Sequence, residues 1–336
     1  MPHKFDDLSA MTPEEREQYF GRLYEGSPEI WEETKDILLY EVNNHVAYIT
    51  FNNPEKQNAI PIPAQIRLTH LIRQAEYDED VKVLVIRSNG KDFGTGGDAG
   101  ELGYYIGYGD GKTKEGLKRP SQRRRIWPDR DVTYSQRGCD GTLLHFTKLS
   151  ICAVKGYCYG LHFQLAMSAD LVVATDDTLF SHPAWRYLGP VFNYFTLLDT
   201  IGRRATMELL FTGGPFTAQR ALQLSMVNSV VSRDQLDAEV QQFVDAAMCR
   251  SMDGIVMGKV MLQMVSQGRG MGLGEMAGWV GHPWMTNQVY NDWEYNWTKE
   301  RRDKGFTQAI TEVDERIPQR FRLSRRRRSM QKQAPK

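Results

Sequence analysis

The sequence predicts an α/β fold, because short apolar strands alternate with glycine-rich turns and helices. Residues 81–87 are apolar and β-branched, as buried strands are, and a turn with glycines at 94, 96, 97 and 100 follows them. Residues 151–170 repeat this order of strand, glycine turn and helix, and a further apolar strand at 171–174 follows. From residue 234 onward the apolar spacing is helical. We therefore expect an α/β core with a helical C-terminal region.

The first part of the chain predicts an extension, a hairpin and a helix. Residues 1–35 are polar, and Thr12 followed by proline and acids is a helix start signal, so a helical extension is expected. Residues 36–41 and 45–51 read as the two strands of a hairpin. Residues 64–77 then show apolar side chains at helical spacing.

Residues 104–148 form an unusual stretch that is long and rich in glycine and charge. A loop of this length inside a compact domain is usually functional or disordered. Its basic run at 118–127 can meet phosphates or lie solvated, and the solvated loop is the favoured interpretation. Residues 134–149 are expected to become helical as the chain returns to the core.

The second half of the chain predicts mainly helices. Two helices are expected at 195–201 and 205–211, on either side of Gly202. A capped helix at 217–224 precedes a last short strand at 226–232. Residues 241–320 are expected to form the helical C-terminal region, and the basic residues 321–336 a disordered tail.

Composition excludes some classes of function. The chain has 336 residues, and its 42 Lys plus Arg equal its 42 Asp plus Glu, so charge gives no general attraction to nucleic acid or membranes. No apolar run approaches the roughly 20 residues that a membrane span needs. The four cysteines lack metal-ligand spacing, so no metal site is expected, and free thiols in the cytoplasm are the default. The basic tail can touch acidic surfaces, but a solvated tail is favoured and nucleic acid is not an expected partner.

Two strand–turn–helix units can each direct one backbone N–H to the same carbonyl oxygen, which makes an oxyanion hole. In this chain the two turns resemble those of the crotonase (enoyl-CoA hydratase/isomerase) superfamily. The first matches the pattern Phe-x-x-Gly-x-Asp, and the second matches Val-x-Gly-x-x-x-Gly followed by a helix with Leu-Ala and a later Asp. The matching residues are Phe93, Gly96 and Asp98 in the first turn, and Val154, Gly156, Gly160, Leu165, Ala166 and Asp170 in the second.

Two further stretches, 46–59 and 208–231, also match, so the resemblance covers residues 36–240 in order. It implies a spiral of ββα units with residues 104–148 as an insertion beside the substrate, and a helical C-terminal region that forms trimers or dimers of trimers. It also implies an acyl-CoA substrate, with coenzyme A as part of that substrate and no bound prosthetic group.

The resemblance implies that the backbone N–H groups of Gly97 and Leu161 hold the thioester carbonyl. A carbonyl held in this way acidifies the adjacent carbon, because charge moved onto its oxygen is stabilised. The resulting enolate serves hydration, isomerisation, thioester cleavage and C–C bond cleavage alike. The oxyanion hole therefore indicates the class of intermediate and leaves the reaction open.

The side chains that would carry protons depart from the hydratase pattern. Gln164 stands where a hydratase has one glutamate, and residues 183–185 contain no carboxylate where the second would lie. Glutamine cannot exchange a proton near pH 7, so ordinary hydration is not favoured. His162 either serves as the acid–base group or packs within its helix. His182 either reaches the pocket or caps a turn, and Trp185 lines the pocket or the core.

The same resemblance suggests where coenzyme A would bind. The loop that holds Lys56, Asn58 and Ala59 would embrace the nucleotide together with Thr95. Lys56 either pairs with a phosphate or is a solvated charge. Two other groups complete the expected set. Asp98 adjoins the donor glycine, although capping of the next helix is its favoured role, and Phe306 and Arg316 of the terminal helix would close over a neighbouring subunit's nucleotide.

These observations favour an enzyme of the crotonase superfamily that forms an enolate from an acyl-CoA thioester. The aromatic residues at 185–194 and the long insertion favour a non-standard lyase, hydrolase or isomerase with a bulky or cyclic acyl group. The alternatives are an enoyl-CoA hydratase proper, and a non-catalytic homologue that binds coenzyme A or RNA.

Overall fold

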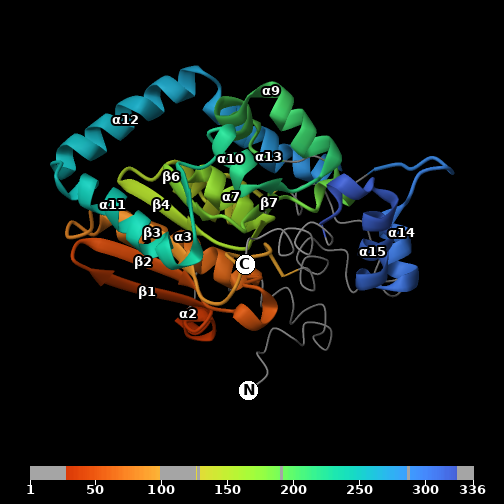
Figure 1. Ribbon diagram of the computed structural model, residues 1–336, viewed down its shortest axis with the longest axis horizontal. Helices are drawn as coiled ribbons and strands as arrows, with labels where there is room; N and C mark the ends of the chain where they lie inside the picture. The colour runs from red at the N-terminus through yellow and green to blue at the C-terminus, as the bar shows by residue number, and fades with distance from the viewer. Residues whose placement is uncertain (1–27, 99–125, 127–128, 190–191, 286–287, 324–336) are drawn as a thin grey trace.

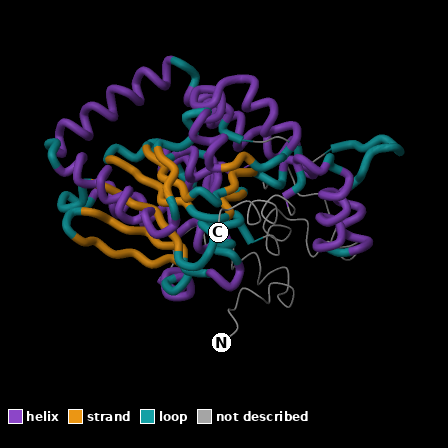
Figure 2. Tube along the Cα trace, viewed as in Figure 1, coloured by secondary structure: helices purple, strands orange, loops and turns teal. Residues whose placement is uncertain are grey.

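The computed structural model describes residues 28–98, 126, 129–189, 192–285 and 288–323 (Figure 1). The helix start at Thr12, most of the insertion at 104–148 and the basic tail from 324 lie outside the described residues. In Figure 2 the strands run together across the left and middle of the chain trace, and most helices lie above them and to their right, in agreement with the α/β prediction.

The larger of two sheets has six strands. Its order is β1 (Leu38–Asn43), β2 (Val46–Phe51), β3 (Val83–Ser88), β4 (Leu149–Val154), β6 (Leu171–Thr175) and β9 (Ser229–Val231). The first two strands form the predicted antiparallel hairpin, and each later strand pairs in parallel with its neighbour. Because parallel strands end at the same edge of a sheet, the turns after β3 and β4 start side by side.

The two faces of this sheet are covered by different helices, and β3 shows how. Side chains alternate between the faces of a strand. Val83 and Val85 therefore pack on one face with helix α11 (Leu236–Met248), whereas Leu84 and Ile86 point into the main core on the other face. The main core also receives the predicted helix α3 (Ile62–Tyr77), whose buried residues include Leu68.

A second, three-stranded sheet closes the main core. Its order is β5 (Tyr157–Tyr159), β7 (Leu179–Ser181) and β8 (Phe216–Thr217), and β5 follows directly from the glycine turn after β4. The smaller helices α6 (Cys139–Leu144), α7 (Leu161–Ser168) and α10 (Ala218–Gln223) fill the remaining sides, and α2 (Pro28–Thr34) contacts α3. The predicted cap of α10 is confirmed, because Thr217 Oγ1 accepts a hydrogen bond from the Arg220 N–H.

Helix α9 (Tyr194–Thr212) corresponds to the two helices expected on either side of Gly202. Gly202 has φ 70° and ψ 168°, which breaks the helical path and lets the chain change direction. A residue with a side chain would be strained at this positive φ. The glycine therefore separates the two halves, as the sequence indicated.

The C-terminal region is helical, as predicted. Helix α12 (Met252–Gly268) spans one side of the molecule in Figure 1, and α13 (Met271–Met285) returns to pack against α9 and against the π-helical segment η4 (Asp129–Tyr134). Helices α14 (Trp297–Lys304) and α15 (Phe306–Arg316) form a pair at the other end.

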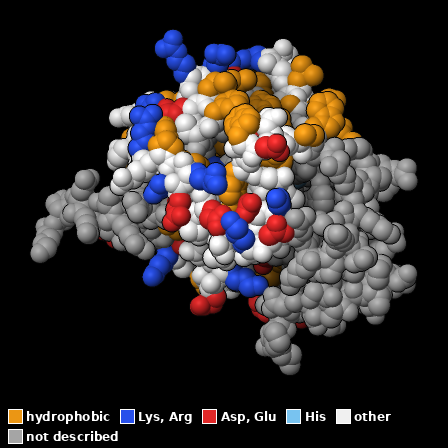
Figure 3. Space-filling model, turned by 90° about the vertical axis from the view of Figure 1, so that its right-hand side faces the viewer, with side chains coloured by type: hydrophobic (Ala, Val, Ile, Leu, Met, Phe, Trp, Pro, Cys, Tyr) orange, Lys and Arg blue, Asp and Glu red, His pale blue; other side chains and the backbone are white. Residues whose placement is uncertain are grey.

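Helix α12 carries apolar side chains that are more than half exposed in this chain, namely Met257, Met261, Leu262, Met264 and Val265. Figure 3 looks onto the side that holds α14 and α15, and hydrophobic side chains gather there toward the top, where Figure 1 places α9. The predicted trimer or dimer of trimers stays a prediction.

No helix in the described part of the chain is both long and apolar enough to cross a bilayer.

Candidate active site

The two glycine turns are hydrogen-bonded to each other along their backbones. The Phe93 N–H donates to the Lys155 carbonyl at 2.6 Å, and the Gly94 N–H donates to the Tyr157 carbonyl at 2.8 Å. In return the Tyr159 N–H donates to the Gly94 carbonyl at 2.9 Å. The two motifs that the sequence places about 60 residues apart are therefore one joined structure at the ends of β3 and β4.

The tips of the turns meet glycine to glycine. Gly96 has φ 104° and Gly160 has φ 59°, both in the region that favours glycine. A Cβ on Gly96 would lie 3.2 Å from the Leu161 nitrogen, and a Cβ on Gly160 would lie 3.2 Å from the Gly96 Cα. Any side chain at these two positions would strain the backbone and push the turns apart.

Two backbone donors follow these glycines. The Ile60 N–H donates to the Gly96 carbonyl at 3.0 Å, and the Asp98 N–H donates to the Ile60 carbonyl at 2.9 Å, so the N–H of Gly97 between them faces the other way. Leu161 is the first residue of α7, where an N–H has no partner within the helix. Neither the Gly97 nor the Leu161 N–H donates to another residue that the structure describes. Two uncommitted N–H groups thus lie on turns that touch.

His162 braces the first turn. Its side chain is fully buried between Phe51 and Phe93, and its Nδ1 accepts a hydrogen bond from the Gly96 N–H at 3.0 Å. Burial lowers the pKa of His162 to about 3, so the ring is neutral, and because Nδ1 accepts, the proton is on Nε2. Of the two roles that the sequence left open, these contacts favour packing and positioning over proton transfer.

Gln164 lies one helical turn beyond Leu161, and its buried side chain joins three elements. Its Nε2 is 3.3 Å from the Tyr134 hydroxyl of η4 and 3.3 Å from His182 Nε2, which follows β7. We call these three side chains the Gln164 cluster. It adds the Tyr134 phenol to the Gln164 amide and the His182 imidazole, which the sequence had offered as candidates.

His182 is held by an aromatic group. Its ring stacks on the buried Trp185 ring at 4.9 Å between centroids, and Phe192 approaches both rings edge-on. Burial, and to a lesser degree the neighbouring His282 of α13, lower the pKa of His182, so its imidazole is neutral at pH 7. Trp185 thereby fixes the ring of His182 and forms part of the core next to the cluster.

The short helix α8 (Trp185–Leu188) is tied to the C-terminal region. Arg186 Nη1 lies 2.6 Å from Asp314 Oδ1 of α15, and Arg186 Nη2 donates to the Phe321 carbonyl. The Arg186 side chain is 3% exposed, so this ion pair is almost fully shielded from water. It fixes the segment that carries Trp185.

The structure brings three of the expected coenzyme-binding residues together beside the first turn. Lys56 Nζ is 3.5 Å from Asp98 Oδ2, and the Thr95 N–H donates to the Gln57 carbonyl at 3.2 Å. The Lys56 side chain is half exposed. The expectation that Asp98 caps a helix concerns residues beyond 98, which lie outside the described part.

Asn58 and Ala59 are held by hydrogen bonds to their own loop and to the turn after β3. The Asn58 side chain is fully buried and donates to the carbonyls of Asn89 and Asp92 at 2.9 and 2.8 Å. The Ala59 carbonyl accepts a hydrogen bond from Asn53 Nδ2 at 2.9 Å. These bonds shape the loop, so the geometry favours a supporting role for both residues.

Phe306 and Arg316 lie on α15, which is the terminal helix that the sequence predicted. The Arg316 guanidinium lies over the Tyr295 ring at 4.4 Å within the same C-terminal unit. Their contact with a neighbouring subunit's nucleotide stays a prediction.

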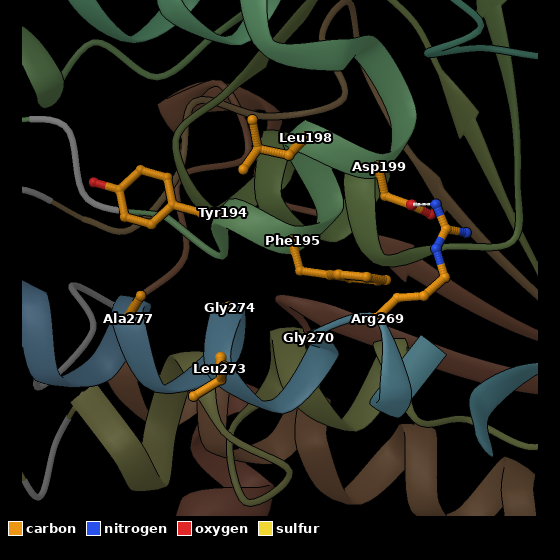
Figure 4. Close-up of a pocket in the computed structure, with 9 residues that line it drawn as sticks. All are labelled: Tyr194, Phe195, Leu198, Asp199, Arg269, Gly270, Leu273, Gly274 and Ala277. Carbon is orange, nitrogen blue, oxygen red and sulfur yellow. Dashed lines mark ion pairs between the residues drawn. The ribbon is translucent and has the colours of Figure 1, made fainter. Parts of the chain in front are cut away.

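A groove lies between α9 and α13 (Figure 4), and no residue of the two turns lines it. It has a volume of about 390 Å³, and the ion pair of Asp199 and Arg269 closes one end. Its lining residues are Tyr194, Phe195, Leu198, Asp199, Arg269, Gly270, Leu273, Gly274 and Ala277. No motif in the sequence predicts this groove. Among the described residues, no group of three or more histidine, cysteine or acidic side chains is arranged to hold a metal ion.

Tyr134 is the residue of this site that sequence reasoning missed. It lies within the long insertion, with no motif around it, and only the folded chain brings its hydroxyl to α7.

Comparison with known proteins identifies the class to which this fold and this site belong. The family model for enoyl-CoA hydratase/isomerase matches residues 41–120 and 133–268. The chain belongs to this family, and its α/β core with a helical C-terminal region is the crotonase fold.

Individual relatives catalyse different reactions, by their names. The chain is 25% identical over 198 residues to a hydroxycinnamoyl-CoA hydratase-lyase of Pseudomonas fluorescens. The matched residues make up 58% of this chain and 67% of the relative. It is 28% identical over 202 residues to a trans-2-decenoyl-[acyl-carrier-protein] isomerase of Streptococcus mutans, covering 60% and 71%. A mevalonyl-coenzyme A hydratase of Aspergillus fumigatus is 26% identical over 215 residues, covering 63% and 72%. Identities this low do not fix the reaction of this chain.

Solved structures agree on the fold. An enoyl-CoA hydratase/isomerase from Xanthobacter autotrophicus Py2 superposes with a TM-score of 0.69 and 25% identity, covering 84% of this chain and 98% of that one. An enoyl-CoA hydratase from Mycobacterium smegmatis superposes with a TM-score of 0.70, covering 86% and 97%. Its 23% identity limits that comparison to the fold.

Proposed function

We propose that this protein is an enzyme that converts an acyl-CoA thioester through an enolate, with the N–H groups of Gly97 and Leu161 binding the thioester oxygen. The observation that carries the proposal is the contact between the two glycine turns, which leaves these two donors uncommitted side by side. Membership of the enoyl-CoA hydratase/isomerase family supports a coenzyme A thioester as the substrate.

The chemistry follows from where the donors act. When a base removes the proton next to a thioester carbonyl, negative charge moves to the carbonyl oxygen. Donors already fixed around that oxygen stabilise this charge without reorganising, and each is worth about 10²–10³ in rate. His162 contributes indirectly, because its bond to the Gly96 N–H fixes the turn that presents the Gly97 donor.

The reaction is a non-standard lyase, hydrolase or isomerase reaction on a bulky or cyclic acyl group. The amide of Gln164 cannot carry a proton, and its side chain is bonded to a phenol and an imidazole rather than to a carboxylate. The bulky acyl group is proposed from the aromatic residues at 185–194, of which Trp185 and Phe192 pack in the core beside the cluster. The names of the relatives, which include a hydratase-lyase and an isomerase, show that the family supports such variety.

The coenzyme A part would lie along the loop next to the first turn. The half-exposed side chain of Lys56 supplies an ammonium for a phosphate, and Asp98, to which it is paired, lies beside the same loop. The exposed apolar face of α12 supports assembly into trimers or dimers of trimers, because such a face is costly to leave in water.

The test removes one donor and little else. Leu161 is the first residue of α7, where proline is tolerated because its missing N–H has no helical partner. Leu161→Pro deletes the donor, whereas Leu161→Ala removes the same side chain and keeps the N–H. The readout is exchange of α-protons of butyryl-CoA and cyclohexanecarbonyl-CoA in D₂O, followed by mass spectrometry. We expect Leu161→Pro to be about 10²–10³ slower than Leu161→Ala. Equal rates for the two variants would contradict the proposal.

A further inference from the structure

The Tyr134 hydroxyl reaches the face of α7 next to the donor end of that helix. It accepts a hydrogen bond from Gln164 Nε2 at 3.3 Å, and Gln164 follows Leu161 by one helical turn on the same face. An acyl group whose carbonyl is held by the Leu161 N–H would therefore have its reacting carbons near this hydroxyl. We infer that Tyr134 is the proton-transferring residue of the site, an inference that rests on the enolate chemistry proposed above.

The ring of Tyr134 packs against α13. A Cβ on Gly278 would lie 3.0 Å from Tyr134 Cδ1, so the absence of a side chain there lets the ring approach the helix. The His282 ring, one turn further along α13, is 6.1 Å from the Tyr134 ring. Tyr134 itself is only 5% exposed. Its hydroxyl is thus fixed in direction, as a group that transfers a proton must be.

His182 is the other candidate, because it lies at the same distance from Gln164. Its environment suits it less well. The ring is clamped against Trp185, and its Nδ1 is buried without a partner among the described residues. Burial keeps the imidazole neutral by lowering its pKa, so at neutral pH it has no acidic proton to give in the way an imidazolium does. A phenol, which ordinarily titrates near pH 10, can give its proton to a far more basic enolate carbon.

The step balances in atoms and charge. The α-carbon of the enolate takes the proton from the Tyr134 hydroxyl, and a C–H bond forms as the O–H bond breaks. The electron pair of that O–H bond stays on the phenolate oxygen, and the oxyanion re-forms the thioester carbonyl. Gln164 Nε2 then donates to a phenolate, which is a stronger acceptor than a phenol. In the reverse direction the phenolate removes the α-proton.

The test uses the full-length protein and the same α-proton exchange in D₂O, with butyryl-CoA and cyclohexanecarbonyl-CoA. Tyr134→Phe keeps the ring that packs on Gly278 and removes only the hydroxyl. We expect exchange to slow by about 10²–10⁴, the usual contribution of a general acid or base, with acyl-CoA affinity unchanged by calorimetry. Tyr40→Phe, on the outer strand β1, is the matched control and should exchange as the unaltered protein does.

A second variant tests the chemistry rather than the packing. With 2,3-difluorotyrosine at position 134, the more acidic phenol should move the alkaline limb of the pH–rate profile to lower pH. If Tyr134→Phe exchanges normally, or if that limb does not move, Tyr134 is not the proton carrier, while the enolate proposal stands. If the unaltered protein neither binds nor exchanges any of these thioesters, both proposals fail together.

Discussion

A buried carboxylate, Asp140, makes stability depend on pH in a direction that can be measured. Asp140 lies on α6 at 1% exposure and accepts a hydrogen bond from the Ser168 hydroxyl. Burial raises the pKa of Asp140 to about 8; the Ser168 hydrogen bond lowers it, and the nearby carboxylate of Glu275 on α13 raises it. The folded state therefore keeps a proton between pH 4 and 8 that the unfolded chain releases. Stability from this group is fully present below about pH 4 and is lost as pH rises through 8.

The substitution Asp140→Asn removes this proton while retaining a carbonyl that can accept from Ser168. One proton is worth about 1.4 kcal/mol per pH unit, so the unfolding free energy of Asp140→Asn should gain on that of the unaltered protein by about 4 kcal/mol from pH 5 to pH 8. Taking the difference between the two proteins cancels the contribution of other groups, including the buried histidines.

Urea unfolding at fixed ionic strength, followed by far-UV circular dichroism at half-unit pH steps, measures this difference. Asp176→Asn controls for the loss of one negative charge, because Asp176 is exposed on the surface. A difference between Asp140→Asn and the unaltered protein that stays flat with pH would refute the assignment of a neutral, proton-bearing Asp140.

Two further predictions concern the turn and the C-terminal clamp. Gly96→Ala places a side chain at a φ of 104°. It should lower the rate of α-proton exchange by at least about tenfold and the unfolding free energy by about 1–3 kcal/mol. The control Gly258→Ala, in the exposed part of α12, should instead raise the unfolding free energy by up to about 1 kcal/mol. Asp314→Ala leaves the buried Arg186 charge without its carboxylate and should lower the unfolding free energy, measured by thermal unfolding, by about 3–5 kcal/mol. Glu41→Ala breaks an exposed ion pair and should lower it by only about 0–1 kcal/mol. Similar losses for the buried and the exposed pair would contradict this account of the clamp.

The sequence predicted the parts of the fold that depend on local pattern. The apolar strand at 81–87, the helix at 64–77 and the break at Gly202 each have a signal within a few residues, namely β-branched runs, helical spacing and a glycine. The joined turns were also predictable, because parallel strands end at one edge and each turn carries its own glycines. Each of these signals lies within a short segment, and a chain that lost the signal would lose the strand, helix or turn that depends on it.

The roles of the candidate acid–base side chains were not predictable in this way, because their contacts come from segments far apart in the chain. Whether His162 faces the substrate or the core depends on Phe51 and Phe93, which close around it only in the folded protein. Tyr134 depends on the return of an insertion and on the missing side chain at Gly278, some 140 residues later. No spacing rule in the sequence connects such positions.

This contrast explains how one fold supports several reactions. The proposed donors, the N–H groups of Gly97 and Leu161, are backbone atoms, so they persist as long as the glycines that join the turns persist. The group proposed to move protons, Tyr134, is a side chain contributed by η4, and such a side chain can change without disturbing the turns. Gln164 connects the backbone donors to the side chains that can vary. Its amide transfers no proton, but it is hydrogen-bonded to both a hydroxyl and an imidazole beside the N-terminal end of α7. A carboxylate at 164 would repel a phenolate at 134, so the amide is the residue that lets Tyr134 take and give a proton there.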